Sequence, residues 1–348
     1  MKFDSIDSAV KELKKRGMVV VLDNEDRENE GDLVMASDAV TSSSINFMAK
    51  EGRGLICISV SNSRAKKLDL KPMEQKNTSL YETAFTVSVD AVKGTTTGIS
   101  APDRCKTIKT IVSDKANPSD LARPGHIFPI IGRNGGVLRR AGHTEASVDI
   151  SKLSNLNPSS VICEVMNEDG RMARLKDLYR FSKKHKIKLA SIEDLISYRL
   201  KYEKLVIKLN SKLVYLNRNH KLNIHYFRNK LENNINFVIT KGSLNKKKSI
   251  PVRVISTSVN KRNILRDVKV NRSIKILSKF KSYLLLIINK QKKVSQDSNI
   301  NTLRYYGIGA QIIKDLNVKN MILLSRSRKK IIGLDGFGLK IKKQIIIK

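Results

Sequence analysis

Five carboxylates crowd around a single arginine in residues 25–32, and no other segment constrains the fold of this chain as strongly. The segment follows closely on the apolar run Met18–Leu22, which predicts a buried strand. Because packed like charges repel, the loop after that strand must be fully solvated or must hold cations. Mg²⁺ and Mn²⁺ are hard ions that prefer carboxylate oxygens. For this segment alone, an acidic surface loop without an ion is an equal alternative.

The length of the chain predicts two domains. It has 348 residues, of which 40% are hydrophobic and 28% charged, as is typical of globular proteins. The three cysteines form no CxxC pair and the N-terminus lacks an apolar signal segment, so we expect a cytoplasmic protein. The apolar stretch 283–288 is too short to span a bilayer, and we expect no membrane partner.

Positive charge is concentrated in the second part of the chain. Residues 206–348 contain 33 Lys and Arg against 5 Asp and Glu, a net charge of +28, whereas residues 1–205 have a net charge of +7. A domain this basic can bind nucleic acid by neutralising phosphates. Its basic residues are scattered without a regular stripe of aromatic residues between them, and its Asn/Ile/Lys bias is typical of drift under weak constraint. We therefore do not expect specific nucleic-acid binding.

Short apolar runs alternate with helical patterns through the first 200 residues, which predicts an α/β or α+β domain. The predicted helices are 5–16, 42–51, 103–113, 177–185 and one that begins at Ser191; the predicted strands are 18–22, 55–60 and 85–89. Residues 197–205 are predicted to be the tether into the second domain. That domain is predicted to contain a helix at 310–316 and a strand at 321–324, with glycine turns near its end.

Three further segments have the composition of a binding site. Residues 94–100 form a hydroxyl-rich loop between glycines, which suits a phosphate, although a plain turn is the alternative. Residues 123–129 place His126 in a Pro/Gly loop, where a simple surface histidine is the alternative. Residues 139–145 combine two arginines, His143, a hydroxyl and a carboxylate. This set suits an anion and a metal, and a basic turn closed by an ordinary ion pair is the alternative.

Together, residues 26–32, 94–104, 123–129 and 140–145 resemble 3,4-dihydroxy-2-butanone 4-phosphate synthase of riboflavin biosynthesis. The resemblance covers residues 1–202, in the order of the family. It implies conversion of D-ribulose 5-phosphate into (2S)-2-hydroxy-3-oxobutyl phosphate (3,4-dihydroxy-2-butanone 4-phosphate) and formate, with Mg²⁺ or Mn²⁺. It also implies an α/β fold that works as a homodimer with its sites at the interface.

The same resemblance implies roles for individual residues. Glu28 and His143 would hold the metal, and His126 and Glu164 match the two positions that the family needs for turnover. We expect Glu28 to be largely unpaired without metal. The implied substrate contacts are Arg27, Glu28, Asp32, Arg140, Ala141, Gly142, His143, Thr144 and Glu164.

These roles agree with elementary chemistry. A divalent ion on the ketose oxygens would acidify the adjacent C–H, and a carboxylate would then remove the proton. Glu164 and the acidic loop remain alternatives for that base. His126 and the acidic loop could pass protons to the departing hydroxyl, and Arg140 offers a phosphate two parallel donors. Cys57 would lie near the site, and a buried apolar cysteine is the favoured interpretation for it.

The second domain, residues 206–348, resembles GTP cyclohydrolase II at 305–311 and 333–339, but the chemistry of that family is missing. The family binds zinc through three cysteines, whereas residues 256–271 contain none, so we expect no zinc. Arg304 of the family signature is present without its acidic partner, and the GTP loop has become 289–294. We therefore expect no cyclohydrolase activity. The alternatives are a bifunctional enzyme that also hydrolyses GTP and a basic nucleic-acid-binding protein with a vestigial synthase domain.

Overall fold

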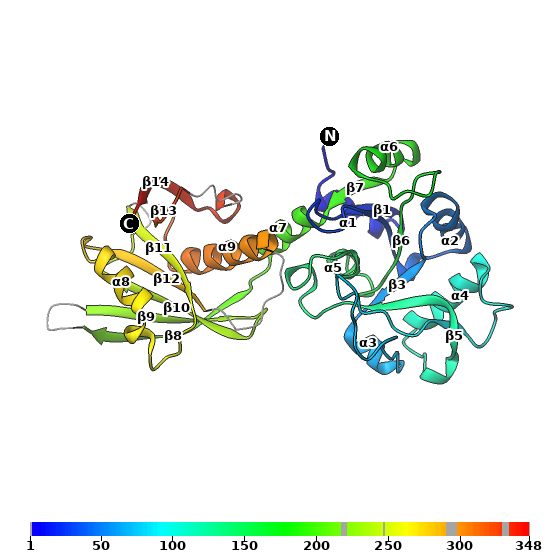
Figure 1. Cartoon of the computed structure of the whole chain (residues 1–348), viewed down its shortest axis with the longest axis horizontal. Helices are drawn as coiled ribbons and strands as arrows, with labels where there is room; N and C mark the ends of the chain where they lie inside the picture. The colour runs from blue at the N-terminus through cyan, green and yellow to red at the C-terminus, as the bar shows by residue number, and fades with distance from the viewer. Residues whose placement is uncertain (1, 217–220, 246–247, 290–297, 329–333, 348) are drawn as a thin grey trace. The chain divides into compact units, whose positions relative to one another are not determined.

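The computed structural model describes residues 2–216, 221–245, 248–289, 298–328 and 334–347. It divides into two compact units, Met1–Ile196 (unit 1) and Ser197–Lys348 (unit 2), coloured blue to green and green to red in Figure 1. Among these described residues, each unit contains one seven-stranded sheet with helices packed against it. This architecture confirms the predicted mixed α/β, two-domain fold class.

The sheet of unit 1 has the strand order β4-β5-β3-β6-β2-β1-β7. Its central strands β1, β2, β3 and β6 are buried along nearly their whole length, which explains their continuous apolar runs. β1 and β2 pair in antiparallel fashion, so the acidic segment is the connection between two buried strands. The bounds are β1 Met18–Leu22, β2 Gly31–Ala36, β3 Cys57–Val60, β4 Val89–Ala91, β5 Leu121–Ile131, β6 Ser160–Glu164 and β7 Lys188–Ser191.

Helices cover both faces of this sheet. α1 (Ile6–Lys14) and α5 (His143–Leu153) pack together on one face, and α2 (Ser42–Phe47), α4 (Ala101–Val112) and α6 (Leu175–His185) lie on the other (Figure 1). The short α3 spans Asn62–Lys67. Side-chain caps from Ser5 and Ser100 begin α1 and α4, because each hydroxyl accepts a backbone N–H of the first turn.

Most predicted elements of unit 1 are confirmed within one or two residues, but the strand predicted at 85–89 is wrong. In segment 85–89 only Phe85 and Thr86 form isolated bridges, and the strand β4 begins at Val89. Thr86 is buried there together with Ser88 and Val89, and its N–H and hydroxyl both donate to the Pro129 carbonyl. The tether predicted at 197–205 begins where unit 2 begins, and most of it belongs to α7, which runs from Ile192 to Tyr202.

The helix predicted at 42–51 has two parts. α2 ends at Phe47, and a π-helical turn, Met48–Gly52, follows it. Arg53 then ends the helical segment in the left-handed region, at φ 69°.

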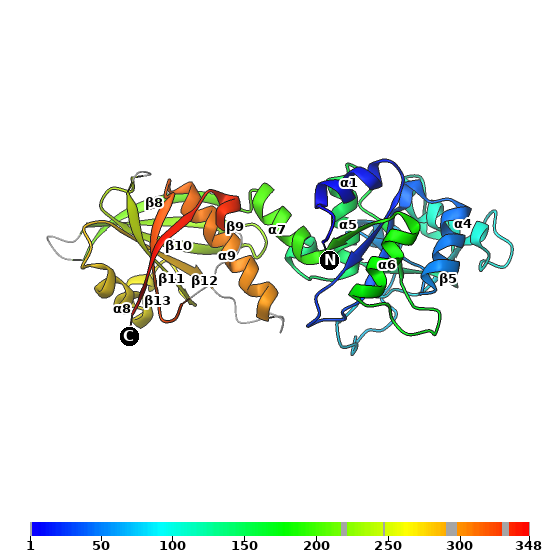
Figure 2. The ribbon, with the colours of Figure 1, turned by 90° about the horizontal axis from the view of Figure 1, so that it is seen from above.

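Unit 2 is built on a second sheet of order β14-β13-β11-β12-β10-β9-β8. α8 (Val268–Leu277) packs on one face with the main apolar cluster, and α9 (Ser298–Asp315) lies along the other face, beside Leu286 (Figure 2). β12 is therefore buried on both sides, which explains the apolar stretch 283–288. The strands are β8 Val206–Tyr215, β9 Lys221–Asn229, β10 Asn234–Lys241, β11 Ser249–Thr257, β12 Tyr283–Asn289, β13 Asn320–Ser325 and β14 Lys340–Ile346.

The two predictions for the end of the chain are confirmed as parts of larger elements: 310–316 falls almost wholly within α9 and 321–324 within β13. The GTP-loop segment 289–294 lies almost wholly outside the described residues, as does the side chain of Arg304. Among the described residues, no helix combines the length and the apolar character that crossing a bilayer requires.

Two valines of α8 provide a matched test of the core of unit 2. Val270 is fully buried in the apolar cluster, whereas Val268 is 80% exposed on the same helix. We expect Val270→Ala to lower the free energy of unfolding by about 2 kcal/mol, because two buried methyl groups are lost and a cavity remains. Val268→Ala should change it by less than about 0.5 kcal/mol. Urea denaturation measures both, and equal effects would contradict the packing of α8.

Candidate active site

The acidic loop between β1 and β2 turns only some of its carboxylates inward. Asp23, the first residue after β1, is buried, and its two oxygens accept the backbone N–H groups of Glu28 (3.3 Å) and Glu30 (2.9 Å). Glu25 and Asp26 lie at the exposed tip of the turn. Asp23 was missed in the sequence, although an aspartate directly after a buried strand was the available signal.

Arg27 balances the negative charge of this cluster. Its guanidinium donates to Asp23 Oδ2 at 2.6 Å and to both oxygens of Glu28 at 2.8 Å, and it lies over the Tyr81 ring. Burial alone would lower the pKa of Arg27, but the charges of Glu28 and Asp23 outweigh burial and raise it. The expectation that Glu28 is largely unpaired is therefore wrong, because the bidentate contact with Arg27 occupies both of its oxygens.

Two residues far away in the sequence fix the backbone of the loop. The Tyr81 hydroxyl donates to the Arg27 carbonyl at 2.6 Å. Arg174, at the start of α6, donates to the carbonyls of Glu28 (2.7 Å) and Asn29 (2.6 Å). Asn29 adopts a left-handed conformation, φ 55°, between these contacts. The loop is thus held through main-chain atoms on its outer side, which leaves its inward carboxylates to face the site.

His143 begins α5 and faces the inward carboxylates. Its Nδ1 lies 3.5 Å from Glu28 Oε2 and 3.8 Å from Asp32 Oδ1, and its Nε2 lies 3.1 Å from the Glu30 carbonyl oxygen. A carbonyl only accepts, so Nε2 carries a proton and donates it there. Burial alone would lower the pKa of His143, but the Asp32 charge and the Glu28 hydrogen bond outweigh burial and raise it to about 9.

These residues fit a divalent cation. The ligand atoms of Asp23, Glu28 and His143 lie within 4.8 Å of one another, and no other such group occurs among the residues that the structure describes. Asp32 Oδ1 is buried beside them without a hydrogen-bond partner. Carboxylates with an imidazole whose other nitrogen donates to a carbonyl form a donor set typical of metal centres. The sequence predicted Glu28 and His143 in this role, and the structure brings them together with Asp23.

Strand register places a further carboxylate next to this group. Asp32 of β2 is paired with Glu164 of β6, and Glu164 Oε2 accepts the Leu55 N–H at 2.8 Å. A Cβ on Gly54 would lie 2.5 Å from the Glu164 carbonyl oxygen, so the close approach requires glycine. The pKa of Asp32 is raised to about 8, chiefly by burial. The positive charge of His143 acts to lower this pKa, but the negative charges of Glu164 and Glu28 add to the effect of burial.

Cys57 is nearly fully buried at the start of β3. Burial, and then the negative charge of Glu164, raise the pKa of its thiol well above the ordinary value. The residue therefore stays protonated and packs as a small apolar side chain, in line with the interpretation favoured from the sequence.

The segment 139–145 forms the turn into α5. Arg140 donates to Glu145 Oε2 at 2.7 Å, to the Thr83 hydroxyl at 2.8 Å and to the Tyr81 carbonyl at 3.1 Å. The ordinary ion pair considered as the alternative is thus present. Ala141, Gly142 and Thr144 are buried around the first turn of the helix. The backbone N–H groups of a helix N-terminus favour an anion such as a phosphate.

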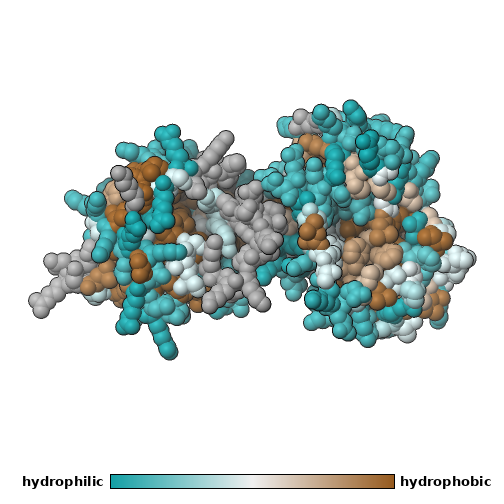
Figure 3. All heavy atoms as spheres, viewed as in Figure 1, coloured by the Kyte–Doolittle hydropathy of each residue, from teal (hydrophilic) through white to brown (hydrophobic). Residues whose placement is uncertain are grey.

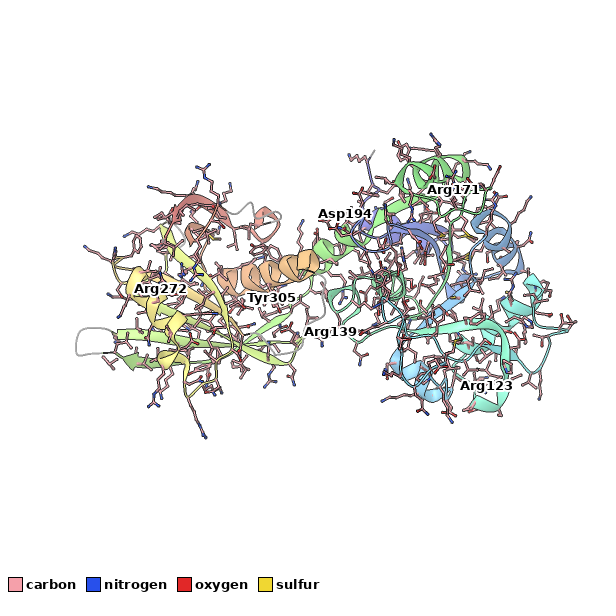
Figure 4. All side chains as sticks on the ribbon, in the orientation of Figure 1. Arg123, Arg139, Arg171, Asp194, Arg272 and Tyr305 are labelled. Carbon is pink, nitrogen blue, oxygen red and sulfur yellow. The ribbon has the colours of Figure 1, made fainter. Side chains whose placement is uncertain are left out.

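His126 lies on β5 and pairs with Asp90 of β4: its backbone N–H donates to Asp90 Oδ1 at 2.9 Å, and its Nδ1 lies 2.7 Å from Oδ2. Among the described residues, no hydrogen bond or ion pair joins it to Glu28, His143 or Glu164 of the same chain. Arg123, labelled in Figure 4, has a structural role, since it donates to the carbonyls of Leu68 and Leu121.

The hydroxyl-rich loop 94–100 is fixed by one carboxylate. Asp103 accepts the N–H and hydroxyl of Thr96 and the N–H of Gly98. The hydrogen bond from the Thr96 hydroxyl contributes most to lowering the pKa of Asp103, against the effect of burial.

Comparisons with known proteins agree with this geometry. The sequence model of the 3,4-dihydroxy-2-butanone 4-phosphate synthase family matches residues 7–198, and that of GTP cyclohydrolase II matches residues 263–346. The riboflavin biosynthesis protein RibBA of Aquifex aeolicus is 43% identical over 100% of this chain and 93% of its own length. The 3,4-dihydroxy-2-butanone 4-phosphate synthase of Photobacterium phosphoreum is 37% identical over 98% of both chains.

Solved structures give the same result. RibBX, a two-domain 3,4-dihydroxy-2-butanone 4-phosphate synthase from A. baumannii, superimposes with a TM-score of 0.82 at 35% identity and covers 99% of both chains. A 3,4-dihydroxy-2-butanone 4-phosphate synthase in complex with two magnesium ions superimposes on 57% of this chain and 98% of its own, with a TM-score of 0.55 at 39% identity. The chain therefore belongs to the 3,4-dihydroxy-2-butanone 4-phosphate synthase family.

Proposed function

We propose that unit 1 converts D-ribulose 5-phosphate into (2S)-2-hydroxy-3-oxobutyl phosphate and formate, as a carbon–carbon lyase of riboflavin biosynthesis. The observation that carries this proposal is the group formed by half-buried Glu28 with buried His143 and Asp23, with Asp32 and Glu164 beside it on paired strands. A five-carbon hydroxy-ketone requires both a Lewis acid and nearby bases for this reaction, and the group contains ligands and carboxylates for both.

Glu28 and His143 would hold the divalent ion, with Asp23 as a further ligand. All of these except the imidazole are hard oxygen donors, so we propose Mg²⁺ or Mn²⁺ and not zinc. When bound, the ion supplies a Lewis acid that polarises the oxygens of the hydroxy-ketone. Arg27 would move from Glu28 toward the substrate as the ion replaces its charge.

The remaining residues would bind the substrate and move its protons. Glu164, held by the Leu55 N–H, and the acidic loop are the candidates for removing the proton next to the ketone. Asp32 has a raised pKa, which suits a group that both accepts and returns a proton near neutrality. Arg140 and the backbone from Ala141 to Thr144 would bind the phosphate end. His126 would protonate the hydroxyl that leaves as water; a carbon shift and hydration then release formate.

We propose that the active form is a homodimer with sites at the interface. Three large apolar side chains adjoin site segments and are exposed in the single chain: Leu80 (85% exposed), Ile99 and Leu55. The visible face of unit 1 in Figure 3 has apolar surface bordered by hydrophilic residues. Exposed apolar surface of this kind is typical of an interaction site. Among the described residues, the chain's own His126 has no hydrogen bond or ion pair with Glu28, His143 or Glu164, and a partner subunit would supply a second His126 to each site.

We propose that unit 2 has no cyclohydrolase activity. All three cysteines of the chain precede residue 164, so the thiolate ligands on which the family's zinc depends are absent from residues 206–348. Membership of the synthase family does not favour the nucleic-acid alternative. The three cysteines are buried and free, which suits the reducing cytoplasm that we propose as the location.

Two glutamates of the acidic loop test the metal site. Glu28→Gln removes a ligand charge and should lower Mg²⁺ affinity at least about 100-fold, with a matching loss of formate release from ribulose 5-phosphate. Glu25→Gln makes the same change at the exposed tip of the loop and should leave both unchanged. Calorimetric Mg²⁺ titration and a formate assay with and without EDTA measure the two effects. Equal Mg²⁺ affinity in the two variants would contradict the assigned ligand.

The raised pKa of His143 predicts that metal binding depends on pH. Below about 9 the metal-free imidazole is protonated, and a ligand imidazole must lose its Nδ1 proton. Binding should therefore release a proton, and affinity should rise by up to about tenfold per pH unit between pH 6 and 8. Calorimetry in two buffers of different ionisation enthalpy counts the released protons. No proton release at pH 7 would contradict a charged His143 in the metal-free protein.

A direct assay tests the proposal for unit 2. Purified full-length protein incubated with GTP and Zn²⁺ should release neither formate nor a pyrimidine product above a blank without protein. The same preparation, given ribulose 5-phosphate and Mg²⁺, should release formate and so serves as the positive control. GTP-dependent product in the zinc reaction would establish the bifunctional alternative.

A further inference from the structure

The pair formed by Asp90 and His126 carries an inference that rests on the proposed function and extends it. Both oxygens of Asp90 are used on a single partner: Oδ1 accepts the backbone N–H of His126 at 2.9 Å, and Oδ2 lies 2.7 Å from the ring Nδ1. A carboxylate that holds the main chain and the ring of one histidine fixes both the position and the rotation of that ring. The Asp90 side chain is 13% exposed, so little water competes for these contacts.

The surrounding backbone is shaped around this pair. Gly98 approaches so closely, at φ 92°, that a Cβ would lie 2.0 Å from Asp90 Oδ2 and 2.6 Å from His126 Nδ1. The loop that carries Gly98 is itself fixed, because Asp103 accepts three hydrogen bonds from Thr96 and Gly98. The hydroxyl-rich loop therefore packs on the Nδ1 side of the ring and covers its contact with Asp90.

We infer that Asp90 is a positioning residue that holds the proton of His126 on Nδ1 and leaves Nε2 as the atom that exchanges protons with the substrate. An ionised carboxylate only accepts, so the 2.7 Å contact requires a proton on Nδ1. In the neutral ring Nε2 is then unprotonated, and in the charged ring it is the nitrogen that can donate. The His126 side chain is 42% exposed, which leaves that nitrogen accessible. The same division of roles operates in catalytic triads, where an aspartate sets the histidine tautomer.

The tautomer can be measured without any activity assay. In long-range ¹H–¹⁵N spectra of ¹⁵N-histidine-labelled full-length protein, assigned with His126→Gln, wild-type His126 should show the Nδ1–H form at a pH where the ring is neutral. The Nε2–H form in the wild type would overturn the inference. This measurement needs no variant of Asp90, so it stands even if that variant folds poorly.

Asp90→Asn then tests the consequence for turnover. The amide can donate to Nδ1, so the ring should change to the Nε2–H form, and kcat for formate release should fall at least about 100-fold with KM nearly unchanged. Asp114→Asn removes the same charge from an exposed aspartate paired with Arg64 and should leave the His126 tautomer and kcat unaltered. An active Asp90→Asn enzyme with normal kcat would overturn the inference. A wild type that has the Nδ1–H tautomer but releases no formate would contradict the proposed function and leave the Asp90 contact established.

Discussion

The repulsion between carboxylates around His143 is the constraint on which the site depends. Asp23, Glu28 and Asp32 are brought together with limited access to water, so their charges must be balanced from within the protein. Arg27 and the protonated His143 supply that balance. A divalent ion would replace both positive charges at once, which couples its binding to a shift of Arg27 and to the release of a proton.

Buried strands hold these opposed charges in place. β2 supplies Asp32 and β6 supplies Glu164 at paired positions, and the loop that carries Glu28 connects β1 to β2. A one-residue shift in register would turn every side chain of a strand to the other face of the sheet. The continuous apolar runs of these strands are thus what determines where the carboxylates lie.

The sequence predicted the local parts of this arrangement. The strand Met18–Leu22 and the pairing of Glu28 with His143 in one site were accessible from apolar runs, motif composition and family resemblance. The roles of Tyr81 and Arg174 could not be predicted from the sequence, because these residues lie 54 and 146 positions away from the loop residues that they contact. Both also donate to backbone carbonyls, which no side-chain pattern reveals. Segment 85–89 was misjudged because a neighbouring carbonyl satisfies the buried hydroxyl of Thr86, and tertiary contacts of this kind override alternation.

The partner of His143 Nε2 is a main-chain carbonyl, that of Glu30. Replacing the side chain at position 30 leaves that oxygen where it is. A point mutation of Glu30 therefore keeps the hydrogen-bond acceptor that orients the imidazole. Only a change in the path of the loop, such as an insertion or deletion between β1 and β2, would remove it. Insertions and deletions in this loop should therefore be poorly tolerated, even though its tip at Glu25 and Asp26 is exposed.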